Sequence, residues 1–217
     1  YIIGEQEFMG LSFAVGEGVL IPRADTEVLV ETILNLRENF KSILDLCTGS
    51  GAAAVSLAKN IPGSRVTAVD ISAKALEYAE RNAERHGVLD RIDFKKRDIL
   101  NWMPRGNYEL VVSNPPYIPR GELPHLQEEV RFEPERALDG GPKGLSFYYT
   151  LGDIAGRCLA PGGGLAMEIG WDQGERVMGI IKSKEIFHHI EIIKDYAHRD
   201  RVILCGGKKL GSGTHEG

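Results

Sequence analysis

The chain has 217 residues, enough for one large domain with a substantial core, and its 42% hydrophobic and 26% charged residues are typical of a soluble globular protein. A net charge of −5 argues against nonspecific binding to bare nucleic acid, which depends on neutralising phosphates. No apolar stretch approaches the roughly 20 residues that a transmembrane helix needs, and no signal peptide is visible. Because the chain begins with Tyr1, we expect a fragment or a trimmed form of a longer protein.

Residues 1–24 predict a β-hairpin followed by a linker. Turn glycines separate two short alternating runs, one around Phe8 and one around Phe13. Asp25 is expected to cap the helix that comes next, whose apolar residues recur at helical spacing at positions 28, 29, 33, 34 and 36.

From residue 42 onward, segments of strand and helix character alternate. The expected strands cover residues 42–47, 65–70, 91–95, 108–113, 163–169, 187–194 and 201–205. The expected helices cover residues 51–60, 73–86, 145–159 and 173–183. This alternation is typical of right-handed βαβ units, so we predict an α/β fold with a doubly wound, mostly parallel sheet over residues 25–205. The polar, glycine-rich residues 206–217 are expected to form a disordered tail.

Cysteines and histidines show no pattern of metal ligands. Cys47, Cys158 and Cys205 are widely separated and odd in number, so we expect small buried apolar residues in a reducing compartment, and we place the protein in the cytoplasm. The adjacent His188 and His189 would point to opposite sides of a strand. We therefore expect no metal.

Acidic residues stand at the ends of three successive expected strands, where doubly wound sheets bind their ligands. Asp45 precedes a turn whose glycines let the backbone approach a ligand closely. Asp70, at the end of the second strand, can accept from both hydroxyls of a ribose. Asp98 follows the third strand and can accept from an adenine amino group, and Trp102 can cover the adenine ring.

The glycine turn alone does not identify its ligand. The dinucleotide pattern G-x-G-x-x-G ends in Ala54 here, a change that dinucleotide-binding proteins tolerate. Asp45 can hold a cationic ammonium but would repel a pyrophosphate. S-adenosylmethionine is a cation with a ribose and an adenine, so it matches the three aspartates in turn. Each aspartate alone is equally compatible with an ordinary strand-end or capping role.

The loop after residues 108–113 carries hydrogen-bond acceptors and few donors. It reads Asn114-Pro115-Pro116-Tyr117, here called the tetrad, and its two prolines lack N–H groups and stiffen the chain. The Asn114 side-chain oxygen and the proline carbonyls suit a planar –NH2 group, beside which Tyr117 offers an aromatic face. Taken alone, the run is equally compatible with a simple turn.

Considered together, the motifs resemble one protein family. They are Gly4–Phe8, Gly16–Arg23 with Thr26 and Glu27, Asp45–Gly51, Ala68–Ser72, Val112–Ile118, Glu133 and Pro134 with 137–141, Glu168–Gly170, and Asp200–Val202. The sequence resembles the class I S-adenosylmethionine-dependent methyltransferases, and specifically the release-factor glutamine methyltransferases of the HemK/PrmC type. It departs from them at Ala24, where proline is common, and at Cys47, where the first glycine of the turn usually stands. We expect a catalytic domain without the family's N-terminal helical domain.

The resemblance implies a seven-stranded Rossmann-like sheet and methyl transfer from S-adenosylmethionine to the N5 amide nitrogen of the glutamine in the Gly-Gly-Gln motif of peptide-chain release factors. It implies that Asn114, Pro115 and Tyr117 are catalytic: the Asn114 oxygen and the Pro115 carbonyl accept the two N–H bonds, and Tyr117 packs against the amide. The cofactor-binding residues expected are Asp45, Cys47, Thr48, Gly49, Ser50, Gly51, Asp70, Ile71, Asp98, Trp102 and Asn114. The substrate-binding residues expected are Asn114, Pro115, Pro116, Tyr117, Arg23 and Glu133. For the last two, an ion pair that fixes a loop is an equal alternative.

Other functions stay open at this point. The tetrad also fits the exocyclic amine of adenine (N6) or guanine (N2), so a nucleic-acid methyltransferase is the main alternative, although a pI near 5.7 argues against it. A non-catalytic binding partner and a nicotinamide oxidoreductase are disfavoured by the intact tetrad and by Asp45, respectively. We expect a release factor as protein substrate, and neither a membrane nor direct nucleic-acid binding.

Overall fold

The computed structural model describes residues 4–127 and 133–209. A seven-stranded sheet forms its centre, with the order β5-β4-β3-β6-β7-β9-β8. The strands are β3 (Ser42–Leu46), β4 (Arg65–Asp70), β5 (Ile92–Lys96), β6 (Tyr108–Ser113), β7 (Leu159–Glu168), β8 (Phe187–Lys194) and β9 (Asp200–Lys208). The five strands β5, β4, β3, β6 and β7 run parallel, and β9 is antiparallel to both β7 and β8. The predicted seven-stranded, mostly parallel sheet is confirmed.

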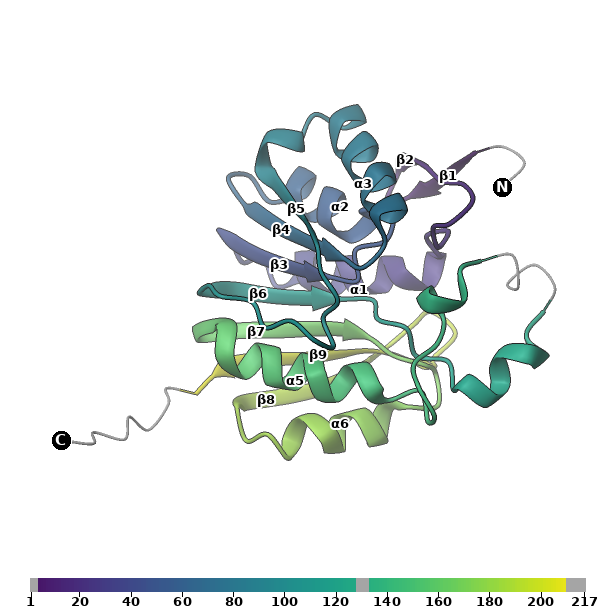
Figure 1. Ribbon diagram of the computed structural model, residues 1–217. Coiled ribbons are helices and arrows are strands. Elements are labelled where there is room, and N and C mark those ends of the chain that lie inside the picture. The colour runs from purple at the N-terminus through teal and green to yellow at the C-terminus, as the bar shows by residue number, and fades with distance from the viewer. Residues whose placement is uncertain (1–3, 128–132, 210–217) are drawn as a thin grey trace.

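Helices cover both faces of the sheet (Figure 1). They are α1 (Ala24–Asn35), α2 (Ala52–Asn60), α3 (Ala73–Arg85), α5 (Ser146–Cys158) and α6 (Gly174–Lys182). Because successive strand residues point to opposite faces, Ile43 packs in the core with α1 and α2, whereas Leu44 packs in the core with α5 and α6. No helix among the residues described is long and apolar enough to cross a membrane.

The predicted hairpin is present before the sheet begins. It consists of β1 (Glu5–Phe8) and β2 (Leu11–Ala14), which pair antiparallel. Buried Asn82 on α3 holds the hairpin: its Nδ2 donates to the carbonyl of Ala14, and its Oδ1 accepts from the N–H of the same residue at 2.7 Å. The hairpin is thereby fixed next to the turn that follows β3, because Asn82 Nδ2 also donates to the Ser50 carbonyl.

Three expectations differ from the structure at element ends. Asp25 does not cap α1: the cap residue is Arg23, and Asp25 lies in the first helical turn, where its charge favours the helix N-terminus. The strand β7 begins at Leu159, four residues before the expected start, because a bulge opposite Tyr108 and Leu110 absorbs the Pro-Gly-Gly sequence. The strand β9 continues to Lys208, so the expected tail is wrong for residues 206–208. Lys209, the next residue, still donates its backbone N–H to the Ile186 carbonyl, and residues 210–217 of the expected tail lie outside the described residues.

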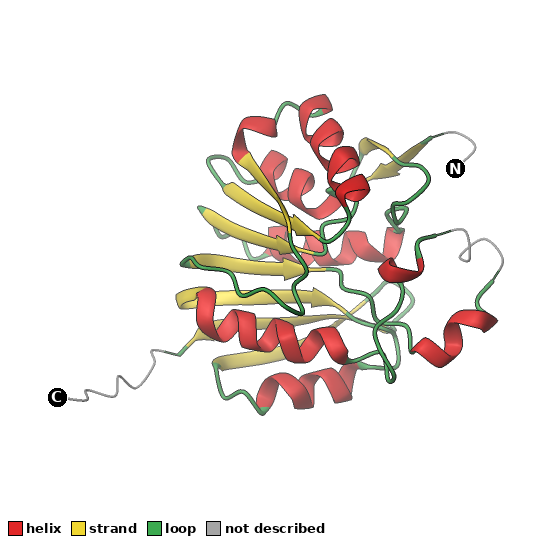
Figure 2. Cartoon of the chain, in the orientation of Figure 1, coloured by secondary structure: helices red, strands yellow, loops and turns green. Residues whose placement is uncertain are grey.

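Parallel strands direct their carboxyl ends to one edge of the sheet. Figure 2 shows the arrowheads of these strands pointing to the same side, where the connecting loops gather. Two short 3₁₀ helices, Arg120–His125 and Glu135–Ala137, belong to these loops. The fold therefore brings the ends of β3, β4, β5 and β6 together, as a ligand site of a doubly wound sheet requires.

Candidate functional site

Two cavities lie at this edge of the sheet. The first, here called the strand-end cavity, has a volume of about 350 Å³, within the usual range for small-molecule sites. Its lining residues from the strand ends are Cys47, Gly49, Asp70, Ile71, Asp98, Ile99, Leu100, Asn114 and Pro116. The second, the tetrad cavity, has about 440 Å³, and its lining includes Arg23, Asn114, Pro115, Tyr117, Glu133 and Glu168. Asn114 belongs to both linings, so it stands where the two cavities meet.

The turn after β3 leads the backbone past the strand-end cavity in a left-handed conformation. Cys47, Gly49 and Gly51 have φ angles of 60°, 57° and 80°. A Cβ atom added at Gly49 would meet no atom within 4 Å, so this glycine leaves space for a ligand to approach the backbone. A Cβ at Gly51 would lie 3.0 Å from the Cβ of Ala79, so that glycine serves the packing of the turn on α3. Cys47 is half-buried and lines the cavity, unlike the fully buried Cys158 and Cys205.

Asp70 ties the ends of β3 and β4 together. Its Oδ2 accepts from the N–H of Gly49 at 2.9 Å, and its Oδ1 accepts from the N–H of Ser72 at 2.8 Å. Burial raises the pKa of Asp70, although these backbone N–H groups favour its charged form. Each oxygen keeps a further lone pair, so the carboxylate can still accept from a ligand.

Asp98 shapes the third strand end. Its Oδ1 accepts from the N–H of Leu100 at 3.0 Å, and its Oδ2 accepts from Asn101 Nδ2 at 2.7 Å. This small turn brings Leu100 to the cavity, where it lies 47% exposed near Ile71, which is 44% exposed. Two exposed apolar side chains at one cavity suit the faces of a flat ring. Leu100 is a site residue that the motifs did not predict, although its position two residues after Asp98 is a signal for it.

Several expected cofactor residues do not line the strand-end cavity in the part of the chain described. They are Asp45, Thr48, Ser50, Gly51 and Trp102. Asp45 is buried behind the turn, where the Thr48 hydroxyl donates to its Oδ2 at 2.5 Å, and burial raises its pKa to about 7. Trp102 packs against the hydrophobic core on the α5 face. The hydrogen bond between Thr48 and Asp45 therefore stabilises the turn after β3. Contact of the five residues with a ligand stays a prediction.

The tetrad follows directly after β6, and two of its residues are held by hydrogen bonds to neighbouring elements. Asn114 Nδ2 donates to Thr26 Oγ1 at 3.0 Å, so the side-chain oxygen Oδ1 is the Asn114 atom left for another partner. The Tyr117 carbonyl accepts from Gln173 Nε2 at 2.9 Å, which holds the end of the tetrad against the loop before α6. Asn114 and Pro115, two of the residues of the predicted acceptor cluster, line the tetrad cavity, and their role as acceptors stays a prediction.

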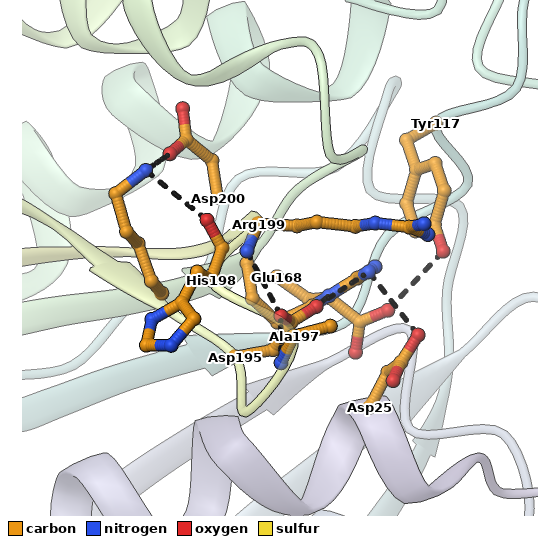
Figure 3. Close-up of polar contacts among 10 residues, drawn as sticks. Asp25, Tyr117, Glu168, Asp195, Ala197, His198, Arg199 and Asp200 are labelled. Carbon is orange, nitrogen blue, oxygen red and sulfur yellow. Dashed lines mark hydrogen bonds and ion pairs between the residues drawn. The ribbon is translucent and has the colours of Figure 1, made fainter.

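Tyr117 points its hydroxyl group toward Glu168, at the end of β7 (Figure 3). Its Oη donates to Glu168 Oε1 at 3.3 Å. Burial, with the nearby Glu168 carboxylate as the next cause, raises the pKa of Tyr117 further above its ordinary value. The hydroxyl consequently stays protonated and acts as a donor, not as a base.

Arg23 and Glu133 contact each other at the rim of the tetrad cavity. Arg23 Nη2 lies 2.9 Å from both carboxylate oxygens of Glu133, across 110 residues of sequence. Glu133 is buried, whereas the Arg23 side chain is 49% exposed. The ion pair joins the start of α1 to the loop that follows the tetrad, which corresponds to the loop-fixing alternative.

Behind the tetrad lies a cluster of charged residues that the sequence motifs did not predict as part of the site. Arg201 on β9 is buried, and its Nη2 lies 3.1 Å from both Asp25 Oδ2 and Asp195 Oδ2. Figure 3 shows Asp25, Asp195 and Glu168 gathered at this place, with Tyr117 above them. Burial raises the pKa of Glu168 to about 7, although the nearby Thr26 hydroxyl, the Arg201 charge and the hydrogen bond from Tyr117 lower it.

Comparisons with known proteins agree with this geometry. A family model described as "Methyltransferase small domain" matches residues 23–131. A release factor glutamine methyltransferase from Moorella thermoacetica is 46% identical over 207 residues, which are 94% of this chain and 73% of that protein. One from Clostridium acetobutylicum is 44% identical over 210 residues, with the same coverage. The solved structure of a methyltransferase from Pyrococcus furiosus has a TM-score of 0.64 at 22% identity, covers 93% of this chain and 91% of its own, and shares the fold.

Proposed function

Since this chain belongs to the release factor glutamine methyltransferase family, we propose that it transfers a methyl group from S-adenosylmethionine to the side-chain amide nitrogen of a glutamine in a peptide-chain release factor. The observation that carries the proposal is the place of Asn114, which lines both cavities and keeps its Oδ1 available. A group held by Asn114 in the tetrad cavity lies next to whatever the strand-end cavity binds. The glutamine of a Gly-Gly-Gln motif is the substrate that we propose.

The strand-end cavity suits S-adenosylmethionine in shape and chemistry. Asp70 and Asp98 offer acceptors for ribose hydroxyls and for the adenine amino group, while Ile71 and Leu100 suit the faces of the adenine ring. Gly49 leaves the backbone open to close approach. When bound, S-adenosylmethionine supplies a methyl group attached to a positively charged sulfur. The carboxylates of this cavity favour that charge.

A glutamine amide is a poor nucleophile, because its nitrogen lone pair is delocalised into the carbonyl. In our proposal, Asn114 Oδ1 and the Pro115 carbonyl accept the two N–H bonds and fix the nitrogen toward the strand-end cavity. The same acceptors stabilise the positive charge that develops on the nitrogen. Orientation of two reactants can lower a barrier by roughly 7–11 kcal/mol. The nitrogen gains the methyl carbon as the carbon–sulfur bond breaks, and the electron pair of that bond leaves with sulfur as a neutral thioether. The nitrogen then loses a proton to solvent, which restores the neutral amide.

The nucleic-acid alternative is not favoured. The net charge of −5 gives little attraction for phosphates, and the similar proteins described above are named for release factors. The tetrad alone fits a base amine as well as a glutamine, so the distinction depends on the partner that reaches the tetrad cavity.

The proposal is tested with Asn114→Ala. We expect methyl transfer to a purified bacterial release factor to fall at least 100-fold, while the Kd for S-adenosylmethionine stays within about threefold, because only the acceptor for the substrate is lost. Asn35→Ala, at an exposed position in the last turn of α1, is the control and keeps full activity. Titration calorimetry measures cofactor binding, and mass mapping locates the methyl group. Turnover by Asn114→Ala within tenfold of the unmodified protein contradicts the proposal.

A further inference from the structure

Two buried side chains lie directly behind the tetrad without a role in the proposed reaction. Thr26, in the first turn of α1, is 5% exposed and accepts from Asn114 Nδ2 at 3.0 Å. Glu168, at the end of β7, is 2% exposed and accepts from Tyr117 Oη at 3.3 Å. Each therefore holds one of the two tetrad side chains that carry polar groups (Figure 3 shows the second contact).

The direction of the Asn114 amide depends on the proton of Thr26. A threonine hydroxyl has one proton to donate and lone pairs that accept, and an asparagine amide can present either its oxygen or its –NH2 group. If Thr26 donated to Asn114, the amide oxygen would turn inward and the –NH2 group would face the substrate. The contact observed has the opposite direction, with Asn114 donating to Thr26.

Glu168 explains this direction. A carboxylate accepts hydrogen bonds and cannot donate them, so a charged Glu168 takes the proton of a neighbouring hydroxyl. The nearby Thr26 hydroxyl is among the groups that favour the charged form of Glu168 and lower its pKa. Within the described residues, the buried Oε2 of Glu168 has no partner of ordinary hydrogen-bond geometry, so it is open to accept the Thr26 proton. With that proton committed, Thr26 can only accept from Asn114.

We propose that Thr26 and Glu168 are positioning residues, which fix the Asn114 amide with its oxygen toward the substrate and anchor the ring of Tyr117. The identity of the substrate rests on the function proposed above, whereas the direction of the amide does not. The observed contacts join α1 to the loop after β6, where Thr26 accepts from Asn114, and that loop to the end of β7, where Glu168 accepts from Tyr117. A hydrogen bond from Thr26 to the open Oε2 of Glu168 completes the arrangement in our proposal.

The charge of Glu168 makes this arrangement depend on pH. The groups that face Glu168 are Asp25 and Thr26 on α1, Tyr117 after β6, Tyr148 on α5, and Arg201 on β9 with its partner Asp195. Burial raises the pKa of Glu168 to about 7. Below that pH the protonated carboxyl can donate to Thr26, which frees the Thr26 proton for Asn114 and lets the amide turn. Methyl transfer is therefore expected to decline as the pH falls through about 7.

The first experiment measures kcat and KM of methyl transfer for Thr26→Val, Thr26→Ser and Glu168→Gln. We expect kcat of Thr26→Val to fall about 10- to 100-fold, in line with the cost of a misplaced catalytic group. The KM for the release factor and the Kd for S-adenosylmethionine should stay within threefold. Thr26→Ser keeps the hydroxyl and should retain kcat within threefold. Glu168→Gln should lose the decline of kcat near pH 7.

Thr32→Val is the matched control. It removes a hydroxyl from the same helix, where Thr32 Oγ1 donates to the Val28 carbonyl of its own turn. It should keep the kcat and the pH profile of the unmodified protein. A Thr26→Val variant with kcat within twofold of the unmodified protein and an unchanged pH profile overturns the proposal.

A second experiment needs no substrate. The side-chain –NH2 signals of Asn114 in ¹⁵N–¹H correlation spectra are assigned by their loss in Asn114→Ala. They should shift with a midpoint near pH 7 in the unmodified protein and in Thr26→Ser, but not in Glu168→Gln or Thr26→Val. Signals that are identical in all four proteins at every pH overturn the positioning role, even if methyl transfer occurs. A protein with the expected shifts that does not methylate a release factor overturns the proposed function and supports the positioning role.

Discussion

The two glycines of the turn after β3 should respond very differently to the same substitution. Gly49 and Gly51 both have positive φ angles, of 57° and 80°. A Cβ atom at Gly51 would lie 3.0 Å from Ala79 Cβ and 3.1 Å from Ala79 Cα, whereas at Gly49 it would meet nothing within 4 Å. We predict that Gly51→Ala lowers stability and that Gly49→Ala chiefly lowers cofactor affinity.

The magnitudes follow from the surroundings of each residue. A left-handed alanine costs about 1–2 kcal/mol, and the stiffer unfolded chain returns about 0.4–1 kcal/mol of this. The free energy of unfolding of Gly49→Ala should therefore fall by about 1 kcal/mol. Gly51→Ala adds a cost of about 1–3 kcal/mol for overpacking against the α3 backbone, which gives roughly 2–4 kcal/mol in total. For a protein of this size, that lowers the Tm by roughly 5–15 °C.

The same methyl group in Gly49→Ala occupies space that the strand-end cavity offers to a ligand. If it removes one close backbone contact worth about 1.4 kcal/mol, the Kd for S-adenosylmethionine rises about tenfold. Thermal unfolding followed by circular dichroism and titration calorimetry measure the two effects. Gly179→Ala, within α6 with nothing near its added Cβ, is the control and should be slightly stabilised. Cofactor binding by Gly49→Ala at the unmodified strength, or an unchanged Tm for Gly51→Ala, refutes the reasoning.

Three further predictions concern single side chains. Burial raises the pKa of Asp45 to about 7 in the folded protein. The proton that Asp45 binds therefore stabilises the fold fully below pH 3.8, and this stabilisation is lost as the pH rises through about 7. Between pH 5 and 8, the free energy of unfolding measured with urea should fall less for Asp45→Asn than for the unmodified protein, by an amount on the order of 2 kcal/mol. Asn82→Ala strands the polar backbone groups of Ala14 and Ser50 and should cost about 3 kcal/mol in the same assay. Leu100→Ala should raise the Kd for S-adenosylmethionine about fivefold with little change in Tm, because its half-exposed side chain would lose contact chiefly with a bound ligand and not with the core.

The fold was largely predictable because its signals are local. Strands and helices alternate at lengths that only βαβ units explain, and the observed elements follow the expected ones closely. Element ends were less predictable, since they depend on distant partners. Asp25 has the character of a helix cap, but its carboxylate instead contacts Arg201 on β9. The early start of β7 depends on a bulge beside β6, which the Pro-Gly-Gly sequence does not reveal.

The residues of the site likewise differ in whether local sequence or packing with other parts of the chain determines their position. Gly49, Asp70 and Asp98 were predictable from their places at strand ends, and they line the strand-end cavity. Asp45 has the same local signal but lies behind the turn, because the neighbouring Thr48 hydroxyl and the helix that follows draw its carboxylate inward. A strand end thus predicts that a carboxylate is near the site, and only the packing decides which side of the backbone it occupies.

The tetrad shows why acceptor chemistry cannot be assigned from its four residues alone. Two prolines remove donors locally, but an asparagine amide carries both a donor and an acceptor group. The group that faces the substrate is decided by Thr26, 88 residues earlier in the sequence, and in our proposal by Glu168, whose carboxylate commits the threonine proton. If an uncharged or apolar residue stood in place of Glu168 at the end of β7, the same four tetrad residues would not fix which group of the Asn114 amide faces the substrate. The specificity of the loop for an –NH2 group therefore depends on charge buried beneath it as much as on the motif itself.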